Sequence, residues 1–354
     1  MSNNSTLNNA KNSPDTDEWY TTYESIVEEL NHYEAQFYNK IVLCNCDDPF
    51  NSNFTYYFLQ NFNRLHLKKL ICTSYSKSKI KMVQGNTKIS MSSQKDKKTT
   101  PESYILMVSE VPGNPGDIVS DMDIAQILKK KGVVKRLKGE GDFRSKTCVK
   151  YLKQCDICCT NPPFSLFSNL FSLLIKYNKK FLLIGNQNAL TYKEIFPYIK
   201  KDKAWIGYRF GHMAFRVPQD SKPRKTRFWI DHTGQKWRSI GNAMWLTNLD
   251  IPKRHKFLEL TQHYSPSKYP KYDNFDAINV NRVKDIPIDY NGIMGVPITF
   301  LKYYNCKQFE IIGEANHGSD NEFDLFKPLL SGKALFKRIL IKRKLDENGE
   351  SYEI

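Results

Sequence analysis

The chain has 354 residues, of which 40% are apolar and 13% aromatic, and this composition excludes a wholly disordered protein. It carries 53 Lys and Arg against 37 Asp and Glu, a formal net charge of +16. This surplus favours a polyanionic partner, because basic side chains that contact phosphates release condensed counterions. A basic, soluble protein without a nucleic-acid role is the alternative.

The apolar runs and the cysteines limit the class of protein further. No run approaches about 18 apolar residues, and the N-terminal residues are rich in Asn and Ser. We therefore expect no membrane span, no signal peptide and a cytoplasmic protein. Cys155, Cys158 and Cys159 resemble half a zinc site, but no second pair follows at ligand spacing. Buried thiols explain these positions, so we expect no metal.

The N-terminal part of the chain alternates between helix and strand signals. Residues 1–14 are polar and are predicted to form a disordered lead. A helix is predicted over 19–30, with Thr16 or Asp17 as its N-cap. The next elements follow in alternation: a strand at 41–44, a helix over 54–62 and a strand at 70–73.

Residues 76–120 interrupt this pattern with Lys, Ser, Gln, Pro and Gly, apart from an apolar run at 104–108. The stretch is too long for a tight connection. We expect either a mobile insertion near the site or a hairpin that lies over the surface.

The periodic pattern then returns and predicts a helix over 123–128, a turn at 139–143, a strand at 155–159, a helix over 165–177 and a strand at 180–184. Strands that alternate with helices at this spacing predict βαβ units and a mainly parallel sheet. Ligands gather at the carboxyl ends of such strands. Asp47, Asp142 and Asn161 follow such ends and are candidates for one pocket.

The residue pattern changes beyond residue 205, where short strand-like segments contain many basic and aromatic residues. We expect a domain boundary here, with one domain over 15–204 and a further region over 205–354, which becomes the DNA target-recognition region and C-terminal part if the resemblance described below holds. The candidate DNA contacts are basic residues of one stretch: Arg209, Arg216, Arg224, Lys225, Arg227 and Arg238. A charged, solvated face is the alternative.

The strongest chemical signal is Asn161-Pro162-Pro163-Phe164, directly after an apolar strand. The amino group of adenine is a poor nucleophile, and acceptors for both N–H groups favour the positive charge that grows on it during transfer. An Asn oxygen and the next carbonyl can accept together if two prolines hold the backbone rigidly. Phe164 can stack on the extruded base. The alternative is a proline-rich turn with Asn161 as a helix cap.

The chain also resembles the EcoRI-type adenine-specific DNA modification methylases. The shared segments run in order along the chain: 17–18, 20–21, 44–49, 141–145, 160–167, 245–250, 269–274 and 294–301. The resemblance implies a Rossmann-like, mainly parallel seven-stranded α/β methyltransferase sheet, followed by a C-terminal DNA-recognition region. It also implies S-adenosyl-L-methionine as the cofactor.

The resemblance assigns roles to individual residues. Asn161, Pro162, Pro163 and Phe164 would hold the target base. The cofactor residues would be Asp17, Trp19, Tyr20 and Thr21 at the methionine part, Asn45, Asp47, Asp48 and Pro49 after the first strand, and Asp142 and Phe143 at the adenine. The chain departs from the common pattern because it has no glycine run after the first strand and no acidic residue at 73–75. Asp47 or Asp48 is therefore expected to bind the ribose, unless both cap the next helix.

These observations predict a DNA adenine-N6 methyltransferase of the restriction-modification type, acting on double-stranded DNA, with GAATTC as the site that the resemblance implies. We expect a monomer, and a cognate restriction endonuclease that acts on the same site without a stable complex. The alternatives are a methyltransferase of RNA or of a protein glutamine amide, and a catalytically silent DNA-binding relative.

Overall fold

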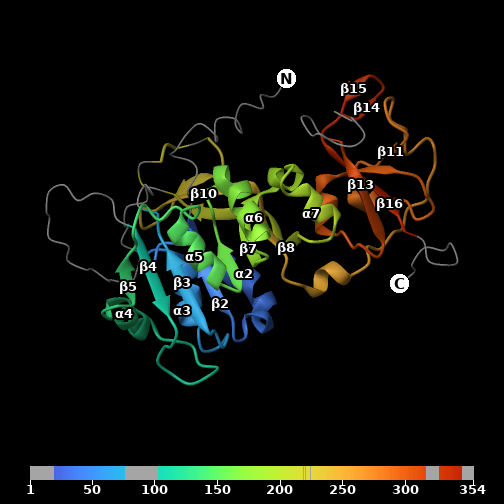
Figure 1. The fold of residues 1–354 in the computed structure, drawn as a ribbon. Coiled ribbons are helices and arrows are strands. Elements are labelled where there is room, and N and C mark those ends of the chain that lie inside the picture. Colours follow the sequence, from blue (N-terminus) through green and yellow to red (C-terminus); the bar gives the residue numbers. More distant parts are fainter. Residues whose placement is uncertain are drawn as a thin grey trace. The chain divides into compact units, whose positions relative to one another are not determined.

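The computed structural model describes residues 20–75, 103–217, 219, 221–223, 225–315 and 327–344 (Figure 1). The chain divides into two compact units. Unit 1 comprises residues up to Gln187 together with Tyr208–Leu249, and unit 2 comprises Asn188–Gly207 and the chain from Asp250 onward. The motifs singled out above lie in unit 1, and each unit is treated by itself.

Ten strands of the described chain form one large sheet. Its order is β1 (Tyr20–Thr21), β8 (Trp205–Arg216), β10 (Lys236–Thr247), β7 (Lys180–Asn186), β6 (Ile157–Thr160), β2 (Ile41–Cys44), β3 (Lys69–Thr73), β4 (Tyr104–Val108) and β5 (Val134–Arg136), with β9 (Phe228–Ile230) paired to β10. The four central strands, from β7 to β3, are parallel to one another. The pairs that flank them, β10 with β7 and β3 with β4, are antiparallel.

The predicted α/β class is correct, but the predicted sheet describes only the centre of the observed one. We expected seven mainly parallel strands, whereas the described sheet is mixed and has ten. Apolar alternation indicates that a segment is a strand but carries no information on its direction. Strands that follow one another through turns, as β9 and β10 do, pair antiparallel.

The strand order reverses between β2 and β6. From β2 the chain moves outward to β3, and after β5 it returns to β6 on the other side of β2. Since crossovers between parallel strands are right-handed, the helices that follow β2 and β6 cover opposite faces of the sheet. A crevice opens at the carboxyl ends of two strands that diverge in this way, and ligands bind there in α/β proteins.

The helices of unit 1 are α2 (Tyr23–Leu30), which continues into η2 (Asn31–Phe37), α3 (Asn53–Gln60), α4 (Asp121–Lys129), α5 (Lys146–Gln154), η3 (Phe164–Leu166) and α6 (Phe167–Lys176). The short helix η4 (Gln187–Thr191) begins at the last residue of the first segment of unit 1 and continues into unit 2. Four of the helices of unit 1 begin at polar N-caps. The side chains of Thr22, Ser52, Ser120 and Ser145 accept hydrogen bonds from the first turns of α2, α3, α4 and α5. Their apolar faces, including Ile26, Phe58 and Leu170, are fully buried.

Three boundaries differ from the prediction. The first helix begins at Tyr23 with Thr22 as its N-cap, not near residue 19 with Thr16 or Asp17, because Tyr20–Thr21 pairs as a strand with β8. The run at 104–108 is not part of a surface insertion: it is β4, and Leu106 is fully buried beside β3. Residues 76–102 lie outside the described residues.

The third boundary is the one expected at residue 205. Residues 208–249 belong to unit 1, because β8 and β10 extend its sheet beyond β7. The second unit instead begins at Asn188 and resumes at Asp250.

Unit 2 has its own small sheet. Its elements are α7 (Phe196–Lys200), η5 (Pro252–His255), β11 (Ile278–Asn279), η6 (Val283–Asp285), β12 (Met294–Pro297), η7 (Ile298–Lys302), β13 (Phe309–Ala315), β14 (Leu329–Leu330), β15 (Lys333–Ala334) and β16 (Arg338–Arg343). Four of these strands pair in the order β11, β12, β16, β13 around the fully buried Ile278, Val296, Phe309 and Leu340. No helix in the described part of the chain is long and apolar enough to span a membrane.

Candidate active site

The loops after β2 and β6 are joined at the point where the strand order reverses. The hydroxyl oxygen of Thr160 accepts from the backbone N–H of Cys46 at 3.2 Å. The same hydroxyl donates to Oδ2 of Asp47 at 2.5 Å. A threonine that ends β6 therefore fixes the loop that follows β2, and with it the start of the Asn161 motif.

Asp47 is the centre of this junction. Its side chain is buried, with 5% exposure for the residue. Oδ1 accepts from the Ser52 hydroxyl at 2.7 Å, and the carboxylate also accepts from the backbone N–H of Asn161. Burial raises the pKa of Asp47 to about 7, against the lowering effect of these hydrogen bonds. Asp47 thus ties the loop after β2, the cap of α3 and the catalytic motif together.

Asp48 has a different environment. It is half-buried, and its Oδ1 accepts from the backbone N–H of Phe50 at 2.9 Å and from the backbone and side-chain N–H groups of Asn51 at 3.1 and 3.0 Å. Burial raises its pKa, and these bonds oppose the rise. Asp48 therefore closes the turn before α3, while the N-cap of α3 is Ser52, so neither aspartate is the helix cap itself.

Asn45 and Pro49 complete this loop and are both buried. The carbonyl oxygen of Asn45 accepts from the Thr73 hydroxyl at 3.2 Å, and its side-chain oxygen faces the thiol of Cys158 at 3.6 Å. Burial raises the pKa of Cys158 well above its usual value. This thiol and its neighbours therefore serve as packing groups, and the described residues contain no cluster of three or more His, Cys, Asp or Glu that could hold a metal ion.

The Asn161 side chain is not a helix cap. The elements that follow it, η3 and α6, have Pro163 and Leu166 at their N-caps, without a side-chain capping bond. Instead Nδ2 of Asn161 donates to the hydroxyl of Thr21, at 3.2 Å. The side chain is thus held at the carboxyl end of β6, as the catalytic interpretation requires.

Phe164 lies at the other end of the motif and is half-buried. Its ring meets Phe215 of β8 edge to face, with centroids 6.5 Å apart and an interplanar angle of 89°. Phe215 is the cross-strand partner of Thr21. The β1–β8 pair therefore contacts both ends of the Asn161–Phe164 segment.

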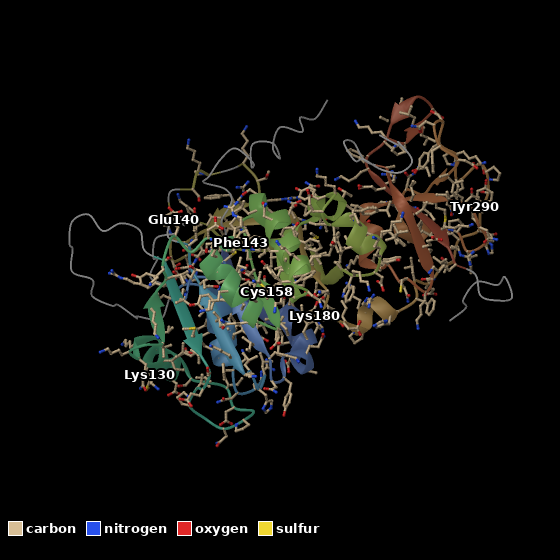
Figure 2. All side chains as sticks on the ribbon, viewed as in Figure 1. Lys130, Glu140, Phe143, Cys158, Lys180 and Tyr290 are labelled. Carbon is tan, nitrogen blue, oxygen red and sulfur yellow. The ribbon has the colours of Figure 1, made fainter. Side chains whose placement is uncertain are left out.

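Asp142 reaches the same edge of the sheet through a glycine turn. Gly141 has φ +80°, and a Cβ there would lie 1.9 Å from the carbonyl oxygen of Ser74, so only glycine allows this approach to the end of β3. Asp142 pairs with Arg144, Oδ2 to Nη2 at 2.6 Å, and this guanidinium lowers the pKa of the carboxyl. Phe143 is buried, and in Figure 2 it lies with Glu140 at the end of the sheet away from Lys130.

Three of the expected cofactor residues are not fully described by the structure. Asp17 and Trp19 lie outside the described residues, and only the backbone of Tyr20 is described. Thr21 is buried, and its hydroxyl contacts Asn161. Thr160 and Ser52 were not singled out from the sequence, although a hydroxyl directly before the motif and a Ser at the start of a predicted helix were available signals.

The basic candidates lie on β8, β9, β10 and their connections. Ala243 of β10 pairs with Asn186, the last residue of β7, so Lys236–Asn242 extends past the edge that carries the motif. Arg238 is on this extension, opposite Phe228 of β9.

The other basic candidates have different surroundings. Arg216 pairs with Tyr20 in the ladder beside Phe215. Lys225 and Arg227 are exposed. Arg209 forms an ion pair with Glu28 on α2, so its charge is already partnered. Arg224 lies outside the described residues.

A parallel centre with a switch point, an Asn-Pro-Pro-Phe loop at that point and acidic residues along the same edge define an α/β methyltransferase that acts on amino groups. The sequence model of the family described as adenine-specific methyltransferase EcoRI matches residues 6–344 of this chain. The chain therefore belongs to the EcoRI family of adenine-specific methyltransferases, and it is a type II DNA adenine methyltransferase of the restriction-modification type.

Individual relatives agree with this assignment. The chain is 46% identical to the type II methyltransferase M.EcoRI of Escherichia coli over 345 residues, which cover 96% of this chain and 97% of the relative. It is 39% identical to M.MgeORF184P of Mycoplasma genitalium over 83% of this chain and 82% of the relative, and 35% identical to M.MpnI of Mycoplasma pneumoniae over 83% and 81%. No solved structure matches it. The predicted enzyme class is confirmed, and the RNA, protein and silent alternatives are set aside.

Proposed function

We propose that this enzyme transfers the methyl group of S-adenosyl-L-methionine to N6 of an adenine that is extruded from duplex DNA, within GAATTC. It acts in the cytoplasm as a monomer, beside a cognate restriction endonuclease that recognises the same site. The observation that carries the proposal is the position of Asn161: its side chain follows β6 at the switch point and is bonded to Thr21 instead of capping a helix.

Hydrogen-bond acceptors along the carboxyl edge of the sheet support an adenosyl cofactor, whose ribose hydroxyls and adenine amine are donors. Among the described residues, every hydrogen bond to the side chain of Asp48 ends on Oδ1. Oδ2 is thus able to accept from ribose hydroxyls, whereas both oxygens of Asp47 are used inside the protein. Asp142 is an acceptor for the adenine amine if Arg144 yields or shares the carboxylate. Asn45, Pro49, Phe143 and residues 17–21 complete the cofactor site.

The cofactor supplies a methyl group on a sulfonium, an electrophile that needs no Lewis acid. The residues of this chain act on the nucleophile. The side-chain oxygen of Asn161 and the carbonyl oxygen of Pro162 accept from the two N–H groups of the target amine. This stabilises the positive charge that develops on nitrogen and is stronger in the transition state than in the ground state. Pro162 and Pro163 fix the backbone that carries both acceptors.

Base extrusion costs a few kcal/mol, and a stacking aromatic offsets about 1–3 kcal/mol of this cost. Two observations favour this role for Phe164: the residue is only half-buried, and its ring packs edge to face against Phe215. Arg216 and Arg238, together with Arg224, Lys225 and Arg227, contact the DNA backbone or bases next to the extruded adenine. Arg209 contributes only if it leaves Glu28.

Labelled S-adenosylmethionine tests the proposal directly. Incubation with a GAATTC duplex is expected to yield N6-methyladenine in the DNA. Duplexes that differ from GAATTC at one base pair, a single-stranded RNA and a mixture of proteins serve as controls, and none of them is expected to accept label at a comparable rate. Equal labelling of the altered duplexes would overturn GAATTC as the site, and labelling of RNA or protein alone would overturn the proposal as a whole.

A further inference from the structure

The side chain of Thr21 contacts that of Asn161. Its hydroxyl oxygen lies 3.2 Å from Nδ2 of Asn161 and accepts a hydrogen bond from it. The two residues are far apart in the sequence, and the contact exists because β1 lies at the edge of the sheet beside β8. The inference drawn here rests on the proposed catalytic role of Asn161.

The hydroxyl of Thr21 has a defined position because its backbone is fixed on both sides. Thr21 pairs with Phe215 in the β1–β8 ladder, and its carbonyl oxygen accepts from Nδ2 of Asn53 at 2.7 Å. The next residue, Thr22, is the N-cap of α2 and accepts from the backbone N–H of Ser25. Only 4% of Thr21 is exposed, so water does not compete freely for its hydroxyl.

The orientation of the Asn161 amide decides whether it can catalyse. The target amine presents two N–H donors and therefore selects the orientation in which Oδ1 faces it; Nδ2 then needs an acceptor on its other side, and the hydroxyl of Thr21 supplies one. After a half-turn of the amide, an N–H group would face the target amine. Two donors would then confront each other, and the acceptor that stabilises the growing positive charge would be lost.

We propose that Thr21 is a positioning residue that holds the Asn161 amide with its oxygen toward the target amine. The same ladder supports the stacking end of the motif through Phe215 and Phe164. Thr21 acts on the hydrogen-bonding end through its hydroxyl, so loss of this hydroxyl lowers the rate of the methyl-transfer step even when the cofactor is saturating.

Thr21→Val tests this role, because valine keeps the shape of threonine and removes only the hydroxyl. We expect the single-turnover rate constant to fall about 5- to 10-fold, the range that follows from the loss of one ordinary hydrogen bond. The rate is measured at saturating S-adenosylmethionine, because Thr21 belongs to the segment proposed for the cofactor site, and the KM for DNA should stay within about twofold of wild type. Thr21→Ser retains the hydroxyl and should restore most of the rate.

A matched control is Thr247→Val on β10. Thr247 is also fully buried, and its hydroxyl donates to the carbonyl oxygen of Phe181 at 2.7 Å, near the opposite end of β7. This variant should lose stability but keep its single-turnover rate. Equal rate losses in Thr21→Val and Thr247→Val would overturn the positioning role, as would a Thr21→Val variant with a normal rate at saturating cofactor.

The variants also separate this inference from the function on which it rests. In an Asn161→Ala background, Thr21→Val should cause no further loss, because the amide that Thr21 orients is gone. A further 5- to 10-fold loss would show that Thr21 acts elsewhere and would overturn the inference. If Asn161→Ala keeps normal turnover, the proposed function fails; if it is inactive while Thr21→Val is normal, only the role of Thr21 fails.

Discussion

Replacement of Asp47 by Asn is expected to slow methylation and to remove a pH dependence of the free energy of unfolding. In wild type the carboxylate accepts from Ser52 at 2.7 Å, from Thr160 at 2.5 Å and from the backbone of Asn161. An amide keeps the shape but has one acceptor end and one donor end. The donor end must face one of these three groups, so at least one hydrogen bond that positions the Asn161 motif is lost or reversed.

The stability effect depends on pH, and its direction follows from the raised pKa of Asp47. The folded protein holds a proton on Asp47 up to a pKa of about 7, whereas the unfolded chain releases it near the ordinary pKa of 3.8. The folded state therefore binds more protons in this window, and wild type loses stability as the pH rises from about 4 to 7. Between pH 5 and pH 8 the loss from this group is about 2.5 kcal/mol.

Asp47→Asn removes this pH dependence. Urea unfolding at pH 5 and pH 8 should show the variant gaining about 2.5 kcal/mol relative to wild type as the pH rises. At pH 8 the variant should be slower than wild type in single-turnover methylation by about 10-fold, because the motif has lost an acceptor. Asp276→Asn, at an exposed position, is the control and should change neither quantity.

Two results would refute this reasoning. One is a wild-type stability, relative to Asp47→Asn, that does not change between pH 5 and pH 8. The other is a variant that folds and methylates at the wild-type rate, because the bonds to Thr160 and Asn161 would then not matter for the geometry of the motif.

Three further predictions concern the cofactor, the DNA and the target base. Asp142→Ala should weaken binding of S-adenosylmethionine in calorimetry, and unchanged affinity in a folded variant would remove Asp142 from the cofactor site. Binding to duplex DNA should fall with salt at a log–log slope of about −0.9 per neutralised phosphate, and a flat dependence would contradict DNA contact by the basic residues. Phe164→Ala should make base extrusion less favourable by about 1–3 kcal/mol. The fluorescence of 2-aminopurine at the target position should then rise less than with wild type, and an equal rise would exclude Phe164 as the stacking residue.

The elements that position the site were predictable where their side chains are buried on both faces. The runs at 41–44, 70–73 and 180–184 are apolar at every position that the sheet core requires, and they became β2, β3 and β7 with small changes in length. The Asn161 motif could be recognised from the sequence because an Asn, two prolines and an aromatic residue directly after a buried strand together suit the binding of an amino group on a base. Asp47 and Asp142 were proposed for the same pocket because each follows the end of a predicted strand.

Other features depend on contacts between distant segments, and no local pattern reports them. Tyr20–Thr21 is a strand only because β8 lies beside it. The helical periodicity of the sequence therefore predicted a helix start near residue 19, whereas α2 begins at Tyr23. The bond between Thr21 and Asn161 depends on the same pairing. Asp47 and Asp48 look equivalent in the sequence, and only the structure shows that Asp47 is buried at the switch point whereas Asp48 is half-buried. Strand direction, and with it the antiparallel flanks of the sheet, is likewise set by connections and not by composition.

The measurement that tests the central claim most directly is the single-turnover methylation rate of Asn161→Ala, determined together with its affinities for cofactor and DNA. We predict a rate at least about 100-fold below wild type, as for the loss of one preorganised acceptor, with both affinities largely retained. A folded Asn161→Ala variant that methylates a GAATTC duplex at close to the wild-type rate would contradict the account.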